Sequence, residues 1–556
     1  MSIFSYIGIA VTIIIAILIA RPTGHYIAYA FENKPNRLDR WFYPIEKWIY
    51  RFGGIKNENQ TWKQYAGAVL ISNSVILLIT YMIFRFQHIL PMNPAGITNM
   101  SPDLAFNTAI SFITNTNLQH YSGESGLSLF SQMTAIIFMM FVSPATGIAV
   151  AIAFIRGITG KPLGNFFTDL VRAITRILLP LAFVMAIVFV GLGVPQTLHT
   201  LITAQTLQGT EQQIGTGPIG SFLAIKELGN NGGGYFGANS AHPFENPGGF
   251  SNMLQMLMML LVPMSLPFTY GKMVGNSKQG RVLFVSMVMM FVVMLSVSLV
   301  SESQGNPLIN QLGIQHQSGS MEGKEVRLGE AQSSFYSVVT TASETGAVNN
   351  MHDTLTPIGG LISLGNMMLN TVFGGSGVGL LNILMYAIIA VFLSGLMVGR
   401  TPEFLGRKIE GKEMKLIAVT LLIQPLLVLA PTAIAVMTQS DTISNPGYHG
   451  LTQALYEFTS SAANNGSGFE GLGDNTPFWN IMTGVVMFIS RYFSMVTLLA
   501  VAGSLMAKKP VPETSGTLRT DQALFGGMFI ISVILVGALT FFPAVVLGPI
   551  AEMLTL

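Results

Sequence analysis

The chain lacks cysteine and carries little charge. None of its 556 residues is cysteine, which excludes a disulfide framework and a thiolate metal site and leaves the redox compartment open. Charged residues make up 10% of the chain, whereas soluble domains hold about 25%. Half of the residues are hydrophobic, and the mean hydropathy is +0.54. These values place the chain among membrane proteins, and the net charge of +2 does not indicate nucleic-acid binding.

Nucleotide motifs are also missing from the sequence. It contains no G-x-x-x-x-G-K-[ST] phosphate loop and no Asp-Lys-Thr-Gly-Thr phosphorylation motif. The longest polar segment on the side that the charge pattern makes cytoplasmic, residues 21–64, has only 44 residues, too few for a nucleotide domain. We therefore expect that this chain binds no nucleotide and that any ATP-driven step depends on another subunit.

Ten hydrophobic runs are long enough to cross a bilayer, which takes about 20 apolar residues as a helix. They lie near residues 2–20, 65–84, 128–155, 173–194, 250–271, 282–300, 366–399, 416–437, 478–506 and 523–547. The first run has no basic stretch before it and no small-residue cleavage site after it. We interpret it as a retained helix and not as a cleaved signal peptide.

The basic residues predict how these helices are oriented. If the chain crosses the membrane ten times, every second connection between spans lies on the same side of the bilayer. Five such connections hold 23 of the 28 Lys and Arg residues. These segments are 21–64, 156–176, 271–281, 400–415 and 507–522. The positive-inside rule makes this side cytoplasmic, so both termini are expected outside the cell membrane.

Four short polar loops recur at near-equal spacing in this apolar chain. Their markers Asn117, Gly232, Gly346 and Gly466 are separated by 115, 114 and 120 residues, which indicates an internal repeat. Each loop follows a segment that is too short and too polar to span a bilayer. These segments are Pro102 to Ile113, Gly220 to Gly229, Ala331 to Ser343 and Thr452 to Ala462.

The composition of the loops predicts an ion-selectivity filter. Glycine tolerates positive φ and asparagine visits the left-handed region, so both allow backbone carbonyls to turn toward a common axis. A ring of carbonyl oxygens can replace the hydration shell of potassium, and a half-helix directs its negative C-terminal end at the ion. The alternative for any single loop is a simple helix cap or turn. Four equivalent loops favour the filter.

The predicted fold is an all-α integral membrane protein with ten transmembrane helices and four pseudo-symmetric helix–pore loop–helix repeats around a selectivity filter. The expected divisions are 1–64 for the first helix and cytoplasmic loop, 65–155, 173–271, 282–399 and 416–506 for the repeats, and 523–556 for the last helix.

Several long motifs resemble the KdpA family, the potassium-binding subunits of bacterial Kdp potassium-transporting ATPases. They are Asn115-Thr116-Asn117-Leu118-Gln119, Asn231-Gly232-Gly233-Gly234-Tyr235-Phe236, Ala238-Asn239-Ser240-Ala241-His242-Pro243-Phe244-Glu245-Asn246-Pro247, Met321-Glu322-Gly323-Lys324-Glu325, Gly346-Ala347-Val348-Asn349 and Gly399-Arg400-Thr401-Pro402-Glu403. The similarity extends from the first helix to Leu547-Gly548-Pro549, which is essentially the whole chain.

The resemblance implies that potassium enters a filter from outside and passes sideways through an intramembrane tunnel to a P-type ATPase subunit. It further implies small accessory subunits and a place in the bacterial plasma membrane. The implied potassium-binding residues are Thr114, Asn115, Thr116, Asn117, Asn230, Asn231, Gly232, Gly233, Ser343, Glu344, Thr345, Gly346, Asn464, Asn465 and Gly466. Gln119 matches a position linked to potassium affinity. No ion other than potassium is expected.

Three features near the filter leave alternatives open. Glu344 stands where relatives can carry serine, and it either adds negative field at the ion or pairs with a group behind the filter. Arg491 is a basic residue deep in a predicted span, where it either blocks a passive exit or forms a buried structural pair. The glycine cluster that interrupts the seventh run is interpreted as a gate, with a passive kink as the alternative. Its glycines are Gly374, Gly375, Gly377 and Gly379.

Two further alternatives concern histidines and the overall function. His242 and His352 flank the filter loops, but their spacing supports polar packing and not a metal site. A free-standing potassium channel or ion-gradient-driven transporter with the same repeats is the alternative to a pump subunit. A purely structural scaffold does not account for the repeated loops.

Overall fold

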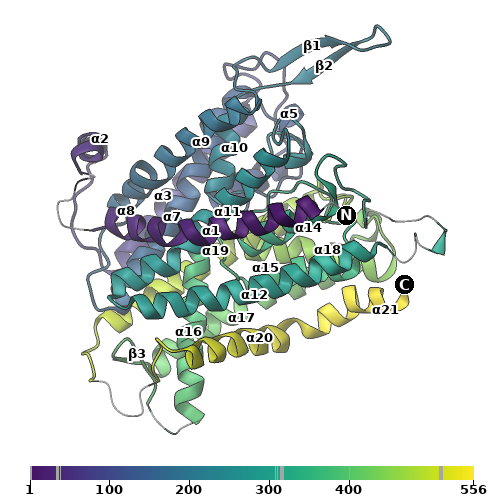
Figure 1. Cartoon of the computed structure of the whole chain (residues 1–556). Coiled ribbons are helices and arrows are strands. Elements are labelled where there is room, and N and C mark those ends of the chain that lie inside the picture. The colour runs from purple at the N-terminus through teal and green to yellow at the C-terminus, as the bar shows by residue number, and fades with distance from the viewer. Residues whose placement is uncertain are drawn as a thin grey trace.

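The computed structural model describes residues 3–32, 37, 39–306, 309, 311–313, 319–397, 399, 401–512 and 518–556. Within these residues, ten helices are long and apolar enough to span a membrane, and they run side by side in one bundle (Figure 1). Short helices and two small antiparallel hairpins complete the fold. Lys34 and Arg400, two of the basic residues that contribute to the predicted orientation, lie outside the described residues.

The elements follow one another in the order that the repeats require. In the first half they are α1 Ile3–Ala30, α2 Asp39–Phe52, α3 Trp62–Phe86, α4 Pro102–Ile113, α5 Gly123–Gly126, α6 Leu129–Ser131, η1 Gln132–Ile137, α7 Phe138–Ile158, α8 Phe166–Arg172, η2 Ala173–Leu178, α9 Leu179–Gly191, β1 Leu201–Gln205, β2 Glu211–Gly215, α10 Ile219–Leu228, η3 Asn239–Ala241 and α11 Gly249–Val274. In the second half they are α12 Ser277–Gln304, α14 Gly329–Ala342, α15 Pro357–Leu369, α16 Val378–Met397, β3 Glu403–Phe404, β4 Arg407–Lys408, α17 Gly411–Thr438, η4 Ser440–Thr442, α18 Gly447–Ala463, α19 Pro477–Met506, α20 Ala523–Val545, η5 Val546–Ile550 and α21 Ala551–Thr555.

The ten predicted spans are confirmed, with two corrections to their limits. The first helix does not stop near residue 20 but continues through Pro22 to Ala30. A proline removes one backbone donor without always ending a helix, because neighbouring helices support the backbone in a membrane. The seventh run, predicted as residues 366–399, is divided into the end of α15, a non-helical break and α16.

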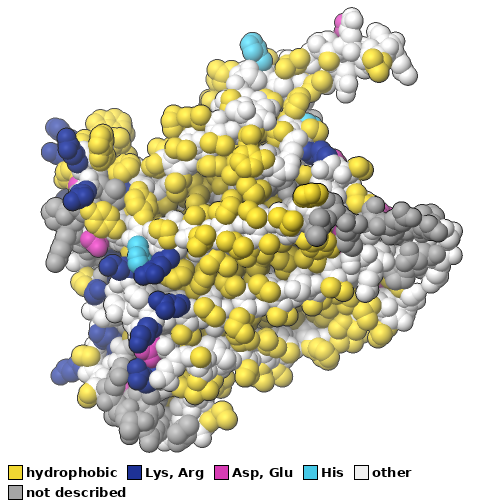
Figure 2. Space-filling model, viewed as in Figure 1, with side chains coloured by type: hydrophobic (Ala, Val, Ile, Leu, Met, Phe, Trp, Pro, Cys, Tyr) yellow, Lys and Arg dark blue, Asp and Glu magenta, His cyan; other side chains and the backbone are white. Residues whose placement is uncertain are grey.

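The bundle is layered around a few central helices. α7, α11 and α16 are mostly buried, whereas α1, α3 and α20 present large apolar side chains on the outer surface. Figure 2 shows this as a broad hydrophobic belt over the middle of the molecule. Such a belt is unfavourable in water and stable against lipid tails.

Charge is separated along the bundle axis. Lys and Arg side chains gather at the end that carries α2 and β3, while both chain termini lie at the opposite end (Figures 1 and 2). This separation is what the positive-inside pattern requires. The assignment of the basic end to the cytoplasm stays a prediction.

Close helix packing depends on small residues at particular crossings. α1 lies along α11, and a Cβ atom added to Gly24 would lie 2.4 Å from the carbonyl oxygen of Ser265 and 2.7 Å from Cβ of Phe268. Membrane helices approach this closely only where a small residue leaves room.

We expect Gly24→Ala to lower the free energy of unfolding by roughly 1–3 kcal/mol, because the added methyl group forces two backbones apart. The matched control is Gly67→Ala in α3, where an added Cβ would meet no atom within 4 Å. Thermal unfolding of the purified protein in detergent measures both variants. Equal melting temperatures for the two variants would contradict this account of the α1–α11 contact.

Candidate functional site

Four half-helices, α4, α10, α14 and α18, converge on the predicted loops. Their limits agree with the four short segments expected from the sequence to within five residues. After each half-helix, a loop N–H group donates to a carbonyl five residues earlier, at 2.9 Å in all four cases. These bonds are Thr116 to Ser111, Asn231 to Lys226, Thr345 to Thr340 and Asn465 to Ser460. The shared bond satisfies a helix-end carbonyl and turns every loop in the same way.

Two equivalent positions in each loop lie in the left-handed region, and Gly233 adds a third in the second loop. The first positions have φ values of 64°, 51°, 50° and 59°, in the order Asn115, Asn230, Glu344 and Asn464. The second positions have φ values of 56°, 73°, 84° and 104°, in the order Asn117, Gly232, Gly346 and Gly466. The repeat seen in the sequence is therefore a repeat of backbone conformation. Glu344 is the third-loop equivalent of three asparagines.

The loops contact one another in a closed cycle. A Cβ atom on Gly232 of the second loop would lie 2.1 Å from the Thr345 carbonyl oxygen of the third. Likewise, a Cβ on Gly346 would lie 2.0 Å from the Asn465 carbonyl oxygen of the fourth loop, and a Cβ on Gly466 would lie 1.9 Å from the Thr116 carbonyl oxygen of the first.

Asn117 completes the cycle without a glycine. Its side-chain amide donates to the Gly232 carbonyl oxygen at 3.3 Å and so connects the first loop to the second. Three of the four junctions thus exclude any side chain, and the fourth uses one as a hydrogen-bond donor.

Amide side chains reinforce the cycle at three positions. Asn115 donates to the Asn230 carbonyl oxygen at 2.7 Å, and Asn230 in turn donates to Oγ1 of Thr345 at 2.9 Å. Asn464 donates to Oγ1 of Thr116 at 2.9 Å. Each asparagine reaches the next loop, so the ring resists opening.

The third loop departs from this pattern because a carboxylate cannot donate. Glu344 is buried, and its Oε2 accepts a hydrogen bond from the Gly375 N–H group at 3.1 Å. Its other oxygen, Oε1, has no hydrogen-bond partner in the described part of the chain. The carboxylate therefore faces the glycine break behind the loops.

The ring leaves backbone oxygens free. Within the described residues, the carbonyl oxygens of Thr116, Asn231, Thr345 and Asn465 accept no hydrogen bond from the protein. These four residues are fully buried. Unpaired buried carbonyls are costly unless another partner binds them, and a dehydrated monovalent cation is such a partner.

The structure brings together all fifteen residues expected in the filter. In the second loop, the residues equivalent to 114–117 are 229–232, one position earlier than the predicted 230–233. Gly233 is the equivalent of Leu118, and the true equivalents of Thr114 and Ser343 are Gly229 and Ala463. Sequence reasoning missed Gly229 and Ala463 because only their backbone matches.

Gln119 bridges two loops on the outer side of the ring. Its side chain donates to the Gly234 carbonyl oxygen at 3.1 Å and accepts from the Gly234 N–H group at 2.7 Å. A two-way amide bond of this kind fixes the spacing of the first and second loops.

An acidic vestibule lies directly above the ring. A cavity of about 120 Å³ is lined by filter residues, among them Asn117 and Gly466, and by Glu457, Glu470 and Asp474. Sequence reasoning missed these carboxylates, although Glu470 and Asp474 follow the fourth loop closely in a chain with little charge. Negative charge at the mouth of a pore attracts cations.

His120 neutralises part of this acidic group. Its ring nitrogens lie 2.7 Å from Oδ1 of Asn480 and 3.2 Å from Oε1 of Glu457, and Oδ2 of Asp474 is 3.9 Å away. Burial lowers the pKa of His120, but Asp474 and Glu457 outweigh this and raise it to about 9. His120 is therefore protonated at neutral pH.

The two histidines considered in the sequence serve as packing groups. His242 stacks on Phe236 with ring centroids 3.7 Å apart and accepts a hydrogen bond from the Phe244 N–H group. His352 bonds through Nδ1 to the Tyr456 hydroxyl at 2.8 Å. Neither contact resembles metal ligation.

The glycine break lies against the back of the filter. The Gly374 N–H group donates to the Ala342 carbonyl oxygen at 2.9 Å, and the Ser376 hydroxyl donates to Oδ1 of Asn230 at 2.6 Å. Gly377 has a φ of +95°, and a Cβ there would lie 2.2 Å from the backbone of Gly147 in α7. The break is thus fastened to two loops and wedged against a central helix.

Arg491 reaches the same place from α19. Arg491 is buried. A Cβ atom added to Gly147 would lie 3.2 Å from Nη2 of Arg491 and 2.4 Å from the carbonyl oxygen of Ser376, so both groups border the same point of α7. In the described part of the chain Arg491 forms no ion pair within 4 Å, and Nη2 has no hydrogen-bond partner. A cationic side chain therefore lies beside the break, beneath the ring.

Comparison with known proteins gives the family and the fold of the chain. A family model described as potassium-transporting ATPase A subunit, KdpA, matches residues 10–554. The crystal structure of the potassium transporter TrkH from Vibrio parahaemolyticus has the same fold, with a TM-score of 0.53 and 16% sequence identity. The match covers 90% of this chain and 98% of that one.

We expect the stability that His120 contributes to be lost as pH rises from about 6.5 to 9. Because the pKa of His120 is raised to about 9, its stabilising charge is fully present below the ordinary value of 6.5 and is lost as pH rises through 9. The contribution is on the order of 3 kcal/mol. Burial raises the pKa of Glu470 to about 7, so that group titrates in the lower part of this window, and a variant that lacks only the histidine is needed to separate the two effects.

Melting temperatures across this pH range, for the unaltered protein and for His120→Gln, measure the effect. The variant should melt lower at pH 7.5 and show a flatter profile. A profile parallel to that of the unaltered protein would refute the assignment.

Proposed function

The chain belongs to the KdpA family of potassium-transporting ATPase A subunits, and we propose that it is the potassium-binding and translocating subunit of an ATP-driven uptake pump. The observation that carries the proposal is the closed ring of four loops with free, buried carbonyl oxygens. Such a ring binds a dehydrated potassium ion through oxygens alone, which suits a hard monovalent cation.

The path through the protein has three stages. Potassium collects in the acidic vestibule, loses its water in the ring and arrives above the glycine break. Glu344 holds the break through Gly375, and Ser376 ties it to the second loop, so the break acts as a gate whose position depends on the filter. Arg491 repels the ion from a direct exit toward the basic end.

A sideways route begins next to the fourth loop. A cavity of about 30 Å³ lies between α15, α16, α17, α18 and α19 and touches Asn464. Its polar lining includes Asn370, Asn382, Thr420, Gln424 and Ser494. Amides and hydroxyls at membrane depth provide oxygen ligands for a cation. This cavity supports delivery through an intramembrane tunnel to a P-type ATPase partner.

ATP hydrolysis takes place in that partner, since this chain carries no nucleotide motif. Small accessory subunits complete the complex. The chain is placed in the bacterial plasma membrane with both termini outside, and repeats 65–155, 173–271, 282–399 and 416–506 each contribute one quadrant of the filter. The fold shared with TrkH favours a second candidate, a free-standing potassium transporter, which would carry potassium without an ATPase partner.

Gly232→Asp is expected to weaken the apparent potassium affinity of the purified complex at least tenfold. The added Cβ would lie 2.1 Å from the Thr345 carbonyl oxygen, so the second and third loops must separate. Potassium-stimulated ATPase activity measures the effect.

Gly209→Asp is the matched control for that variant. Gly209 also has a positive φ, +81°, but meets no atom within 4 Å. Unchanged affinity in Gly232→Asp would contradict the filter. If no ATPase copurifies and the chain alone carries potassium into vesicles, the free-standing transporter is the correct function.

Arg491→Gln is expected to raise passive potassium flux through the chain on the order of tenfold, because a nearby like charge opposes a cation by a few kcal/mol at an effective dielectric constant near 20. Potassium-selective electrodes on sealed vesicles without ATP measure the flux. Arg281→Gln, at an exposed position in α12, controls for loss of charge alone. Equal fluxes would leave Arg491 with a structural role.

A further inference from the structure

Helix α2 has three chemically different faces. Each residue advances about 100° around a helix, which places its side chains in three stripes roughly 120° apart. The anchoring face comprises Asp39, Phe42, Glu46, Ile49 and Tyr50. The apolar stripe comprises Trp41, Ile45, Trp48 and Phe52, and the basic stripe comprises Arg40, Lys47 and Arg51.

A buried ion pair sets the rotation of α2 about its own axis. The carboxylate of Glu46, 1% exposed, accepts from Nε and Nη2 of Arg176, both at 2.6 Å, and from the Thr175 hydroxyl at 3.0 Å. Asp39 lies 2.9 Å from the same guanidinium group. Because these bonds hold one face against η2, the other two stripes must point away from the protein.

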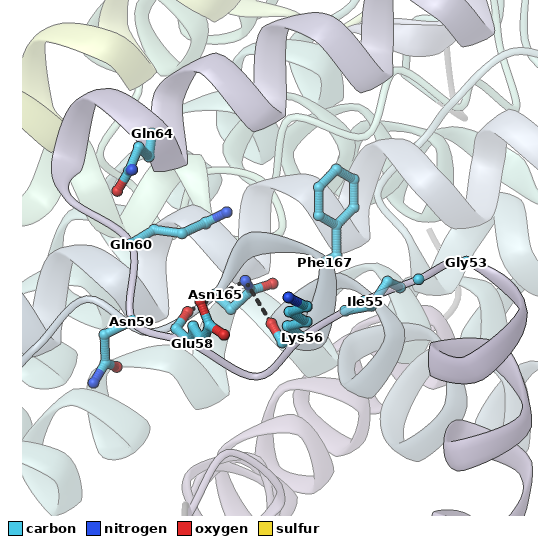
Figure 3. A pocket seen from close by; sticks show the side chains of 10 residues that line it. Gly53, Ile55, Lys56, Glu58, Asn59, Gln60, Gln64, Asn165 and Phe167 are labelled. Atoms are coloured by element: carbon cyan, nitrogen blue, oxygen red, sulfur yellow. Dashed lines mark hydrogen bonds between the residues drawn. The ribbon is translucent and has the colours of Figure 1, made fainter.

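The segment after α2 is also fixed in place. It borders an open depression of about 560 Å³ (Figure 3), where Asn165 donates to the Lys56 carbonyl oxygen at 3.1 Å. Gln60 contributes a backbone N–H bond to the Gly164 carbonyl oxygen at 2.8 Å. The polar groups of this depression therefore hold the linker on α8 and prevent α2 from rolling.

The apolar stripe is unusually exposed. Trp41 is 73% exposed, Trp48 67% and Phe52 85%, and Trp48 stacks on Phe52 with centroids 5.7 Å apart. Large aromatic side chains grouped on one surface mark a contact with a partner or a membrane. On the adjacent stripe, the guanidinium of Arg40 lies 5.9 Å from the Trp41 ring.

The position of α2 indicates which contact this is. It lies at the side of the bundle, at the end where Lys and Arg side chains gather (Figures 1 and 2). α1 ends and α3 begins on either side of it in the chain, so it sits where two spans leave the bilayer. Tryptophan concentrates at the level of the lipid headgroups, and basic residues are drawn to anionic lipid there.

We propose that α2 is an interfacial helix that binds the surface of the bilayer. Its apolar stripe enters the boundary between headgroups and acyl chains, and its basic stripe contacts the phosphates of anionic lipids. Aromatic residues beside a basic face are typical of helices that lie in this plane. A helix that docked on another subunit would not need Arg40, Lys47 and Arg51 turned outward together.

The absence of cysteine allows a direct test. A nitroxide attached to Ile45→Cys, 56% exposed on the apolar stripe, reports local access to oxygen and to a water-soluble nickel chelate. Asn59→Cys, exposed in the linker, is the matched control. The full chain is placed in nanodiscs of phosphatidylcholine, with or without phosphatidylglycerol.

We expect oxygen to reach the label at position 45. The ratio of oxygen access to nickel access should be at least fivefold higher at position 45 than at position 59. Phosphatidylglycerol should increase this ratio, and Arg40→Gln/Lys47→Gln/Arg51→Gln should abolish the increase. Nickel access equal to that of position 59 overturns the proposal. Shielding from both reagents in the whole complex also overturns it, in favour of a protein partner. The readout does not depend on potassium transport, so it stands apart from the proposed function.

Discussion

Three junctions between pore loops leave no space for a side chain, and the arrangement of the filter depends on this constraint. Gly232, Gly346 and Gly466 each lie so close to a carbonyl oxygen of the next loop that a Cβ would stand within 2.1 Å of it. Glycine here permits both a positive φ and a close approach. Since each junction links one quadrant to the next, displacing one loop moves the oxygens contributed by its neighbours.

The polar network behind the ring keeps these loops in place. Asparagine side chains connect successive loops. Each half-helix also ends in the same kind of hydrogen bond, from a loop N–H group to the carbonyl five residues earlier. At membrane depth no water compensates a lost bond, so each of these bonds helps to hold the loops in place. The third quadrant is the exception, where Glu344 turns from the ring to the glycine break. The third loop is therefore hydrogen-bonded, through Glu344 and Gly375, to the glycine break beneath the filter.

The chain has few charged side chains, and acidic and basic groups lie in different regions of the molecule. Carboxylates line the vestibule, Arg491 lies below the ring, and most other basic side chains gather at one end. In the proposed path, a cation is attracted at the entrance and opposed at the direct exit. The amides beside Asn464 offer a third direction, sideways from the filter.

The sequence by itself determined the fold class, the ten spans and the four half-helices, because hydrophobic length and loop spacing are local properties of the chain. It also indicated the fifteen loop residues that the structure brings together, one set of them shifted by a position, since backbone equivalence at Gly229 and Ala463 leaves no side-chain signal. That these residues bind potassium stays a prediction. Only the tertiary structure decided what depends on contacts between distant segments. The cyclic order of the loops, the partner of Glu344, the His120 ion pair and the three faces of α2 all arise from such contacts. No sequence pattern predicts these contacts, because packing brings together residues that lie far apart in the chain.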